Sequence, residues 1–255
     1  MNLLIDAGNT RIKWVLADGD VWLHSGVLPV EQASGLPQFF ADCFGRAGMD
    51  SRDIQIWASN VAGEEAAQHI CNISSGCQPR FVVAQQVQCG VRNGYVNASQ
   101  LGSDRWAALI AAWHLVHGEC LVVGCGTATT IDALSGHGEF LGGLILPGVE
   151  LMQRSLCGAT AQLQPEQGKY APFPLNTADA LLSGAIQASC GAIERQHALL
   201  VNACPEPGRR AAAPVLLSGG AATQLQAHII NLPTQMMDNP VLQGLLLIAQ
   251  EASAR

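Results

Sequence analysis

The sequence predicts an α/β protein of two lobes, each a mixed sheet covered by helices, formed by internal duplication. Two stretches share one layout: an apolar run, a turn rich in glycine and hydroxyl residues, and two further strand-like runs. An offset of 118 residues aligns Gly8 with Gly126 and Leu16 with Leu134. After each stretch, strand-like runs alternate with helical patterns, which is typical of mixed sheets with helices on their faces.

The individual elements follow from short-range patterns. Strand-like runs are short, apolar and bounded by Gly, Asp or Asn turns, whereas helices show apolar residues at a period near 3.6. We assign the N-terminal lobe to residues 1–118 and the C-terminal lobe to residues 119–255. In chain order we expect strands at 3–5, 11–17, 21–27, 54–59, 81–83, 121–123, 129–134, 139–145 and 215–218, and helices at 36–46, 64–73, 103–117, 149–156, 177–203, 221–228 and 241–252.

The composition narrows the possible partners. Hydrophobic residues make up 49% of the chain and charged residues 13%, so we expect apolar surface that a homodimer would cover. Twenty acidic residues against thirteen basic ones give a net charge of -7, which disfavours nucleic acid and anionic membranes as partners. The chain opens on a strand pattern without a leader, and no apolar run reaches the length of a membrane span. We therefore expect a cytoplasmic protein that acts on a small molecule.

The turn after the first expected strand gathers groups that bind phosphate and magnesium. It offers a carboxylate at the strand end, a glycine that permits close backbone approach, and hydroxyl, amide and ammonium groups. Mg²⁺ takes one or two carboxylates together with phosphate oxygens, and the amides of a tight turn hold anions. The alternative is a plain hairpin turn whose Asp and Asn bond their own backbone. The segment consists of Asp6, Ala7, Gly8, Asn9, Thr10, Arg11, Ile12 and Lys13.

The equivalent turn of the second stretch lies between Gly124 and Thr130 and contains two glycines and three threonines. Such a turn can hold the same phosphate chain from the other lobe. Thr127 is the residue that we expect to contact phosphate. Thr129 and Thr130 are also explained as ordinary strand residues. One loop in each lobe predicts a phosphate clamp.

A third group of polar residues opens the helix expected at 103–117. Ser103 or Asp104 at this place is explained as a helix N-cap. As a functional pair, Asp104 supplies a base for an attacking hydroxyl, and the guanidinium of Arg105 supplies paired hydrogen-bond donors for a carboxylate. From these residues alone, both interpretations stay open.

Seven motifs occur in order across nearly the whole chain. They are Asp6-x-Gly8-Asn9-Thr10, Gly102-x-Asp104-Arg105, Gly126-Thr127-Ala128-Thr129-Thr130-x-Asp132, Gly142-Gly143-x-Ile145-x-Pro147-Gly148, Asn176-Thr177, Ser218-Gly219-Gly220-Ala221 and Leu242-Gln243-Gly244-Leu245. This series resembles the type III pantothenate kinases.

The resemblance implies the fold of actin, heat-shock proteins and acetate and sugar kinases, whose actin-like lobes are ribonuclease H-like, with ATP between the lobes and a homodimer. It implies that ATP phosphorylates pantothenate to 4'-phosphopantothenate, the first step of coenzyme A synthesis. The segment from Asp6 to Lys13 would bind the ATP phosphates, with Asp6 holding Mg²⁺. Thr127 would hold phosphate from the second lobe.

The resemblance also implies a substrate site, with Asp104 as the proton acceptor for the pantothenate hydroxyl. Two of these residues have another explanation: Tyr95 as a packing aromatic, and Thr177 as a cap of the long helix. The site would be lined by Tyr95, Gly102, Ser103, Asp104 and Arg105, and closed by Thr177 of the partner subunit.

One position departs from the family pattern. Many members carry an aspartate two residues before the glycine of the second loop, where it binds a monovalent cation such as potassium or ammonium. This chain has Gly124 there, so we expect that it lacks the cation site or fills it with other ligands.

Two rival functions stay open: a sugar or acetate kinase of the same superfamily, and a non-catalytic transcriptional accessory protein like the relatives named Bvg accessory factor. The Gly-x-Asp-Arg motif and the small size argue against the first. The intact set of Asp6, Asp104 and Thr127, together with the acidic net charge, argues against the second.

Overall fold

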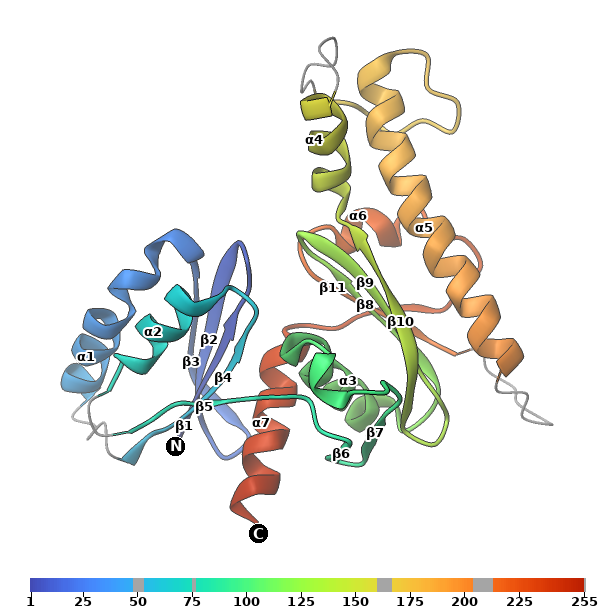
Figure 1. The fold of residues 1–255 in the computed structure, drawn as a ribbon. Helices are drawn as coiled ribbons and strands as arrows, with labels where there is room; N and C mark the ends of the chain where they lie inside the picture. Colours follow the sequence, from blue (N-terminus) through green and yellow to red (C-terminus); the bar gives the residue numbers. More distant parts are fainter. Residues whose placement is uncertain (48–52, 75–76, 160–166, 204–212, 255) are drawn as a thin grey trace. The chain divides into compact units, whose positions relative to one another are not determined.

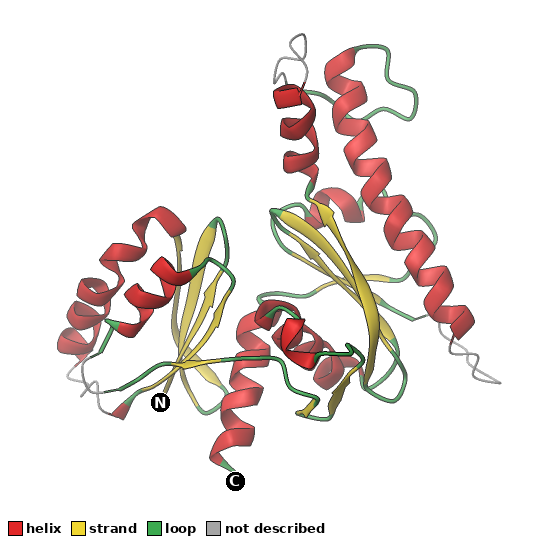
Figure 2. Cartoon of the chain, in the orientation of Figure 1, coloured by secondary structure: helices red, strands yellow, loops and turns green. Residues whose placement is uncertain are grey.

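The computed structural model describes residues 1–47, 53–74, 77–159, 167–203 and 213–254. The chain divides into two compact units, Met1–Ala111 with Pro240–Arg255, and Ala112–Asn239. Figures 1 and 2 show that each unit is built on a twisted sheet with helices packed against it.

The first unit contains a mixed five-stranded sheet in the order β3-β2-β1-β4-β5. β1 pairs antiparallel with β2, and β2 with β3, whereas β4 and β5 continue the sheet in parallel. Leu3, Leu4 and Ile5 of β1 are all fully buried, because this central strand is covered on both faces. The strands are β1 (Asn2–Ala7), β2 (Arg11–Asp18), β3 (Val21–Pro29), β4 (Gln55–Asn60) and β5 (Arg80–Phe81).

Helices cover both faces of this sheet. The 3₁₀ helix η1 (Val30–Gly35), α1 (Leu36–Ala47) and α2 (Glu64–Cys71) bury their apolar side chains against one face. The opposite face is covered by α7 (Pro240–Ser253), which packs on β1 and β4 (Figure 1). Gly244 of α7 lies so close to the backbone of Ala107 that a Cβ would collide with it.

The C-terminal helix α7 therefore groups with the first unit, whereas the lobe expected from the sequence, residues 119–255, placed it in the second. Its apolar residues complete the core of the first sheet, so packing rather than chain order decides where it belongs.

The second unit repeats the topology of the first. Its strands follow the order β12-β11-β8-β9-β10, with β8, β9 and β10 antiparallel and β11 and β12 added in parallel. α5 and α6 bury one face of the sheet in a single apolar cluster. The elements are β8 (Cys120–Cys125), β9 (Ala128–Leu134), β10 (Glu139–Pro147), β11 (Val215–Ser218), β12 (Thr234–Met236), α4 (Val149–Ala159), α5 (Thr177–Ala203) and α6 (Ala222–Gln226).

The same connectivity in both units confirms the predicted fold class of two duplicated mixed sheets with helices. One detail of the alignment is wrong. Leu16 pairs with Leu3 across the first hairpin, whereas Leu121 pairs with Ala133 across the second. The structural equivalent of Leu16 is therefore Ala133 and not Leu134, because the second turn is one residue shorter.

Most expected elements are present within a residue or two of their expected bounds. The short strands β6 (Val87–Gln88), β7 (Val91–Asn93) and β12 and the 3₁₀ helix η3 (Ala98–Gln100) were not expected. Within the described ranges, none of the helices combines the length and the hydropathy that crossing a bilayer requires.

Candidate active site

Asp6 occupies the carboxyl end of β1, at the edge of the first sheet where ligands bind in α/β proteins. In the sheet register Lys13 of β2 lies directly opposite Asp6, and Ser59 of β4 lies beside it. Ser59 is fully buried, and its hydroxyl is 2.9 Å from the hydroxyl of Ser103. The sheet therefore brings a carboxylate, an ammonium group and two hydroxyls to one edge.

The Asp6 carboxyl has a strongly perturbed pKa. Burial raises the pKa of Asp6 from 3.8 to about 7; Lys13 lowers it, and the negative charge of Asp104 raises it further. Asp6 and Asp104 are thus close enough to repel each other. A cation beside Asp6 would offset both its burial and this repulsion, so Asp6 suits Mg²⁺ bound together with phosphate oxygens. Among the residues with described positions, no cluster of three or more His, Cys, Asp or Glu could hold a metal alone.

The first loop exposes the polar residues that the sequence assigns to phosphate. The amide of Gly8 donates to the carbonyl of Arg11 at 3.0 Å, which closes the turn. Asn9, Thr10 and Arg11 are exposed at its tip. The side chains of Ala7 and Ile12 are fully buried in the core, so these two residues offer a ligand only backbone groups.

The N-terminus of α3 (Ser103–Val116) carries the third motif. The carbonyl of Gly102 accepts the amide of Trp106 at 2.9 Å, which begins the helix. A Cβ on Gly102 would lie 2.6 Å from an Asp104 carboxylate oxygen, so a larger residue at position 102 would force that carboxylate to shift. This oxygen also accepts the amide of Arg105 at 2.8 Å.

Tyr95 and Arg105 form a pair, although they are ten residues apart. Nη1 of Arg105 lies 3.2 Å from the Tyr95 hydroxyl, and the guanidinium carbon is 5.9 Å from the centre of the phenol ring. Arg105 is only 7% exposed, whereas Tyr95 is half-buried. A buried guanidinium with a phenol beside it can recognise a carboxylate or an amide of a small ligand.

In the second unit, the loop between β8 and β9 is supported from two sides. The amide of Gly148 donates to the carbonyl of Thr127 at 2.9 Å, and the amide of Ala221 donates to the carbonyl of Cys125 at 3.1 Å. Thr127 is exposed on the loop, as a phosphate contact requires. Thr129 is fully buried on the core side of β9, so it serves the core rather than the loop surface.

The residue that faces Gly124 across the strand pair limits the space for a side chain at position 124. Gly124 pairs with Thr130, and a Cβ at Gly124 would lie 2.8 Å from the Thr130 hydroxyl. The Thr130 side chain therefore fills the space that a larger residue at position 124 would need.

Thr177 opens α5, but it is not the residue that caps the helix. The Asn176 side chain accepts the amide of Asp179 at 2.9 Å, and the Asn176 carbonyl accepts the amide of Ala180 at 3.0 Å. Asn176 is therefore the N-cap, and the interpretation of Thr177 as a cap is wrong.

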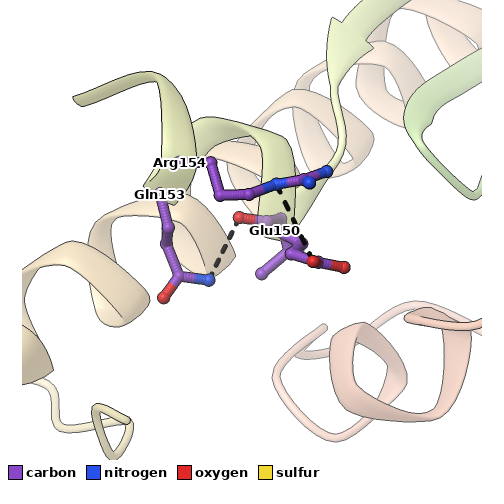
Figure 3. A network of polar contacts seen from close by, with 4 residues as sticks. Glu150, Gln153 and Arg154 are labelled. Atoms are coloured by element: carbon purple, nitrogen blue, oxygen red, sulfur yellow. Dashed lines mark hydrogen bonds and ion pairs between the residues drawn. The ribbon is translucent and has the colours of Figure 1, made fainter. Parts of the chain in front are cut away.

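Thr177 instead lines an apolar groove of about 530 Å³ between α4 and α5. Figure 3 shows Glu150, Gln153 and Arg154 of α4 in polar contacts within the helix, with Arg154 3.7 Å from Glu150 and Gln153 bonded to the carbonyl of Val149. The lining of the groove is Met152, Ser155, Leu156, Thr177, Ala180, Leu181, Gly184 and Ala185.

The first unit therefore contains Asp6, Lys13, Ser103, Asp104 and the Tyr95–Arg105 pair. Thr127 and Thr177 belong to the second unit. Ser59 was not expected at this site, because a serine at a strand end has no sequence signature until a neighbouring strand places it beside Asp6.

Comparison with known proteins agrees with this architecture. Component A of (R)-2-hydroxyglutaryl-CoA dehydratase from Acidaminococcus fermentans aligns with a TM-score of 0.57 at 13% identity, over 100% of this chain and 99% of that one. A chain described as a Baf family transcriptional activator from Campylobacter jejuni aligns with a TM-score of 0.59 at 21% identity, over 99% of this chain and 100% of that one.

The duplicated sheets define an α/β protein with the actin-like fold. A family model for type III pantothenate kinase matches residues 2–198. The type III pantothenate kinase of Nitrosospira multiformis is 46% identical over 256 residues, which cover 98% of this chain and 92% of that protein. This chain belongs to the type III pantothenate kinase family.

Proposed function

We propose that this chain transfers the terminal phosphoryl group of ATP to the hydroxyl of pantothenate, giving 4'-phosphopantothenate. Family membership supports the reaction. The observation that carries the residue roles is the cluster at one sheet edge, where burial and the negative charge of Asp104 raise the pKa of Asp6. Phosphoryl transfer depends chiefly on positioning and on neutralising phosphate charge, and this cluster can do both.

Asp6 and the first loop act on the nucleotide in this proposal. Asp6 would hold Mg²⁺, and the bound ion would neutralise negative charge on the phosphate oxygens. Backbone amides and the exposed side chains of the first loop, together with Lys13, hold the phosphates, and Thr127 adds a contact from the second loop. The half-buried Asp6 needs a cation to be fully ionised at neutral pH, which couples metal and nucleotide binding.

Asp104 and its neighbours act on pantothenate. Asp104 accepts the proton of the attacking hydroxyl, and the glycine at position 102 leaves space for its carboxylate. Arg105 and Tyr95 bind and orient the substrate. Ser103, held by Ser59, lines the same site.

We propose further that this chain has no monovalent-cation site of the family type. A carboxylate at position 124 would need the space that the Thr130 hydroxyl fills, and Gly124 supplies no side chain. Turnover in potassium and in a bulky organic cation such as tetramethylammonium should therefore be equal. A strict requirement for potassium or ammonium would refute this assignment.

The homodimer is also a proposal. The groove between α4 and α5 is apolar, and Phe173 and Leu175 nearby along the chain are 88% and 98% exposed. In the homodimer that the family resemblance implies, Thr177 of the partner subunit would close the substrate site. We expect this enzyme to work in the cytoplasm without nucleic acid or membrane partners.

The direct test is a coupled assay of ADP release from ATP and Mg²⁺, with pantothenate as the acceptor beside acetate and a panel of sugars. We expect release that depends on pantothenate. Release with a sugar or acetate alone would favour another kinase of the superfamily, and no release with any acceptor would favour a non-catalytic protein.

A further inference from the structure

A single buried side chain, Asn93 at the end of β7, braces the loop that carries Tyr95. Asn93 is only 1% exposed. Its carboxamide oxygen accepts the amide of Tyr95 at 3.0 Å, and its carboxamide nitrogen donates to the carbonyl of Ala98 at 3.2 Å. One side chain thus bonds both ends of the short segment 95–98.

The base of the loop is equally constrained. The backbone amide of Asn93 donates to the carbonyl of Gln86 at 2.9 Å, and the side chain of Gln86 donates to the carbonyl of Asn93 at 3.0 Å. The hairpin of β6 and β7 is tied to α3, because Nε1 of Trp106 donates to the Gln88 side chain at 2.8 Å between buried groups. The hairpin that ends at Asn93 is therefore fixed to Trp106, the residue directly after Arg105.

The tip of the loop buries little apolar surface. Val96 at its tip is fully exposed, and Gly94 and Asn97 are also exposed, so burial of apolar surface does not hold the loop in place. Hydrogen bonds must do so, and the bonds that join the two ends of segment 95–98 come from the Asn93 carboxamide.

We propose that Asn93 is a positioning residue for the substrate site: its carboxamide fixes the backbone of Tyr95 so that the phenol meets the guanidinium of Arg105. This inference rests on the proposed function, in which the Tyr95–Arg105 pair binds pantothenate. The Asn93 side chain bonds backbone groups of the loop and would act on the substrate only through Tyr95. Asparagine suits the task because it supplies an acceptor and a donor on one short side chain.

The test is the substitution Asn93→Ala, with KM measured separately for pantothenate and for ATP. Loss of both side-chain bonds should raise the KM for pantothenate about tenfold, while the KM for ATP changes less than about twofold. The variant Asn93→Asp keeps the acceptor for Tyr95 and loses the donor, so it should show a smaller rise in the same KM. If the alanine variant does not fold, Asn93→Asp tests the inference in its place.

A double-mutant cycle separates positioning from a general structural role. If Asn93 acts through Tyr95, Asn93→Ala should change the KM for pantothenate less than about twofold in a Tyr95→Ala background. The inference is overturned if the effects of Asn93→Ala and Tyr95→Ala on the KM for pantothenate add in full. It is also overturned if Asn93→Ala raises the KM for pantothenate and the KM for ATP equally. Asn97→Ala is the matched control, because the exposed Asn97 side chain bonds Ser99 within the same loop and should leave both KM values unchanged.

Failure of the two proposals would look different. Wild-type protein without ADP release that depends on pantothenate would refute the proposed function and this inference with it. Active wild-type protein with an Asn93→Ala variant of unchanged KM for pantothenate would refute the inference alone.

Discussion

Replacing Asp6 with asparagine should stabilise the protein in the absence of metal while abolishing most of its activity. Burial raises the pKa of Asp6 from 3.8 to about 7. Between pH 3.8 and about pH 7, Asp6 therefore keeps a proton in the folded chain that it has released in the unfolded chain. The stability from this group is therefore fully present below pH 3.8 and is lost as the pH rises through about 7. Asparagine at this position stays neutral and avoids that loss.

The change in the free energy of unfolding follows from the pKa shift of Asp6. About three pKa units correspond to roughly 4 kcal/mol in the free energy of unfolding. Asp6 keeps partial contact with solvent, so we expect about half of this, or about 2 kcal/mol in favour of Asp6→Asn at pH 8. In a chain of this size the melting temperature should rise by about 4–8 °C.

The assay is thermal unfolding of both proteins without Mg²⁺ at pH 4 and at pH 8, beside turnover with Mg²⁺ and ATP. The difference in stability should nearly vanish at pH 4, where Asp6 is protonated. Asp18→Asn, at the exposed end of β2, is the control and should change neither quantity. An Asp6→Asn variant less stable than the wild type at pH 8 would refute the reasoning about burial.

Three further substitutions test the proposed site and interface. Asp104→Asn should lower turnover by about 10² to 10⁴ with little change in the KM for ATP, and near-wild-type turnover would remove Asp104 from the role of base. Gly102→Ala places a methyl group 2.6 Å from the Asp104 carboxylate and should lower turnover about tenfold at an almost unchanged melting temperature; unchanged turnover would show that the carboxylate need not occupy this position. Leu156→Glu puts a charge into the apolar groove between α4 and α5 and should halve the mass measured by light scattering; an intact dimer would exclude the groove as the interface.

The parts of the fold that sequence reasoning predicted are those with strong local patterns. The two meanders and the long helix α5 were expected with nearly their observed bounds, because apolar runs, turn residues and helical periodicity are properties of neighbouring residues. The loops with Asp6 and Thr127 were found for the same reason, since each glycine-rich turn follows a strand.

The hairpin of β6 and β7 could not be found in this way. Its strands are two and three residues long, and its turn places Cys89 at a φ of 49° and Gly90 at 80°. A Cys-Gly pair is not a usual signal for such a turn, in which Asn or Asp normally comes first. The amide of Cys89 is instead held by Glu251 of α7 at 3.1 Å, a contact 162 residues along the chain.

The sequence by itself determined the duplicated α/β plan, the two loops and the order of motifs, because each of these lies within a short stretch of chain. Only the tertiary structure decided that α7 completes the first unit, that Ser59 and Ser103 meet beside Asp6, and that Thr130 fills the space at Gly124. The physical reason is the same in each case. Burial, charge repulsion and close packing act between residues that folding brings together, and no local pattern records those distances.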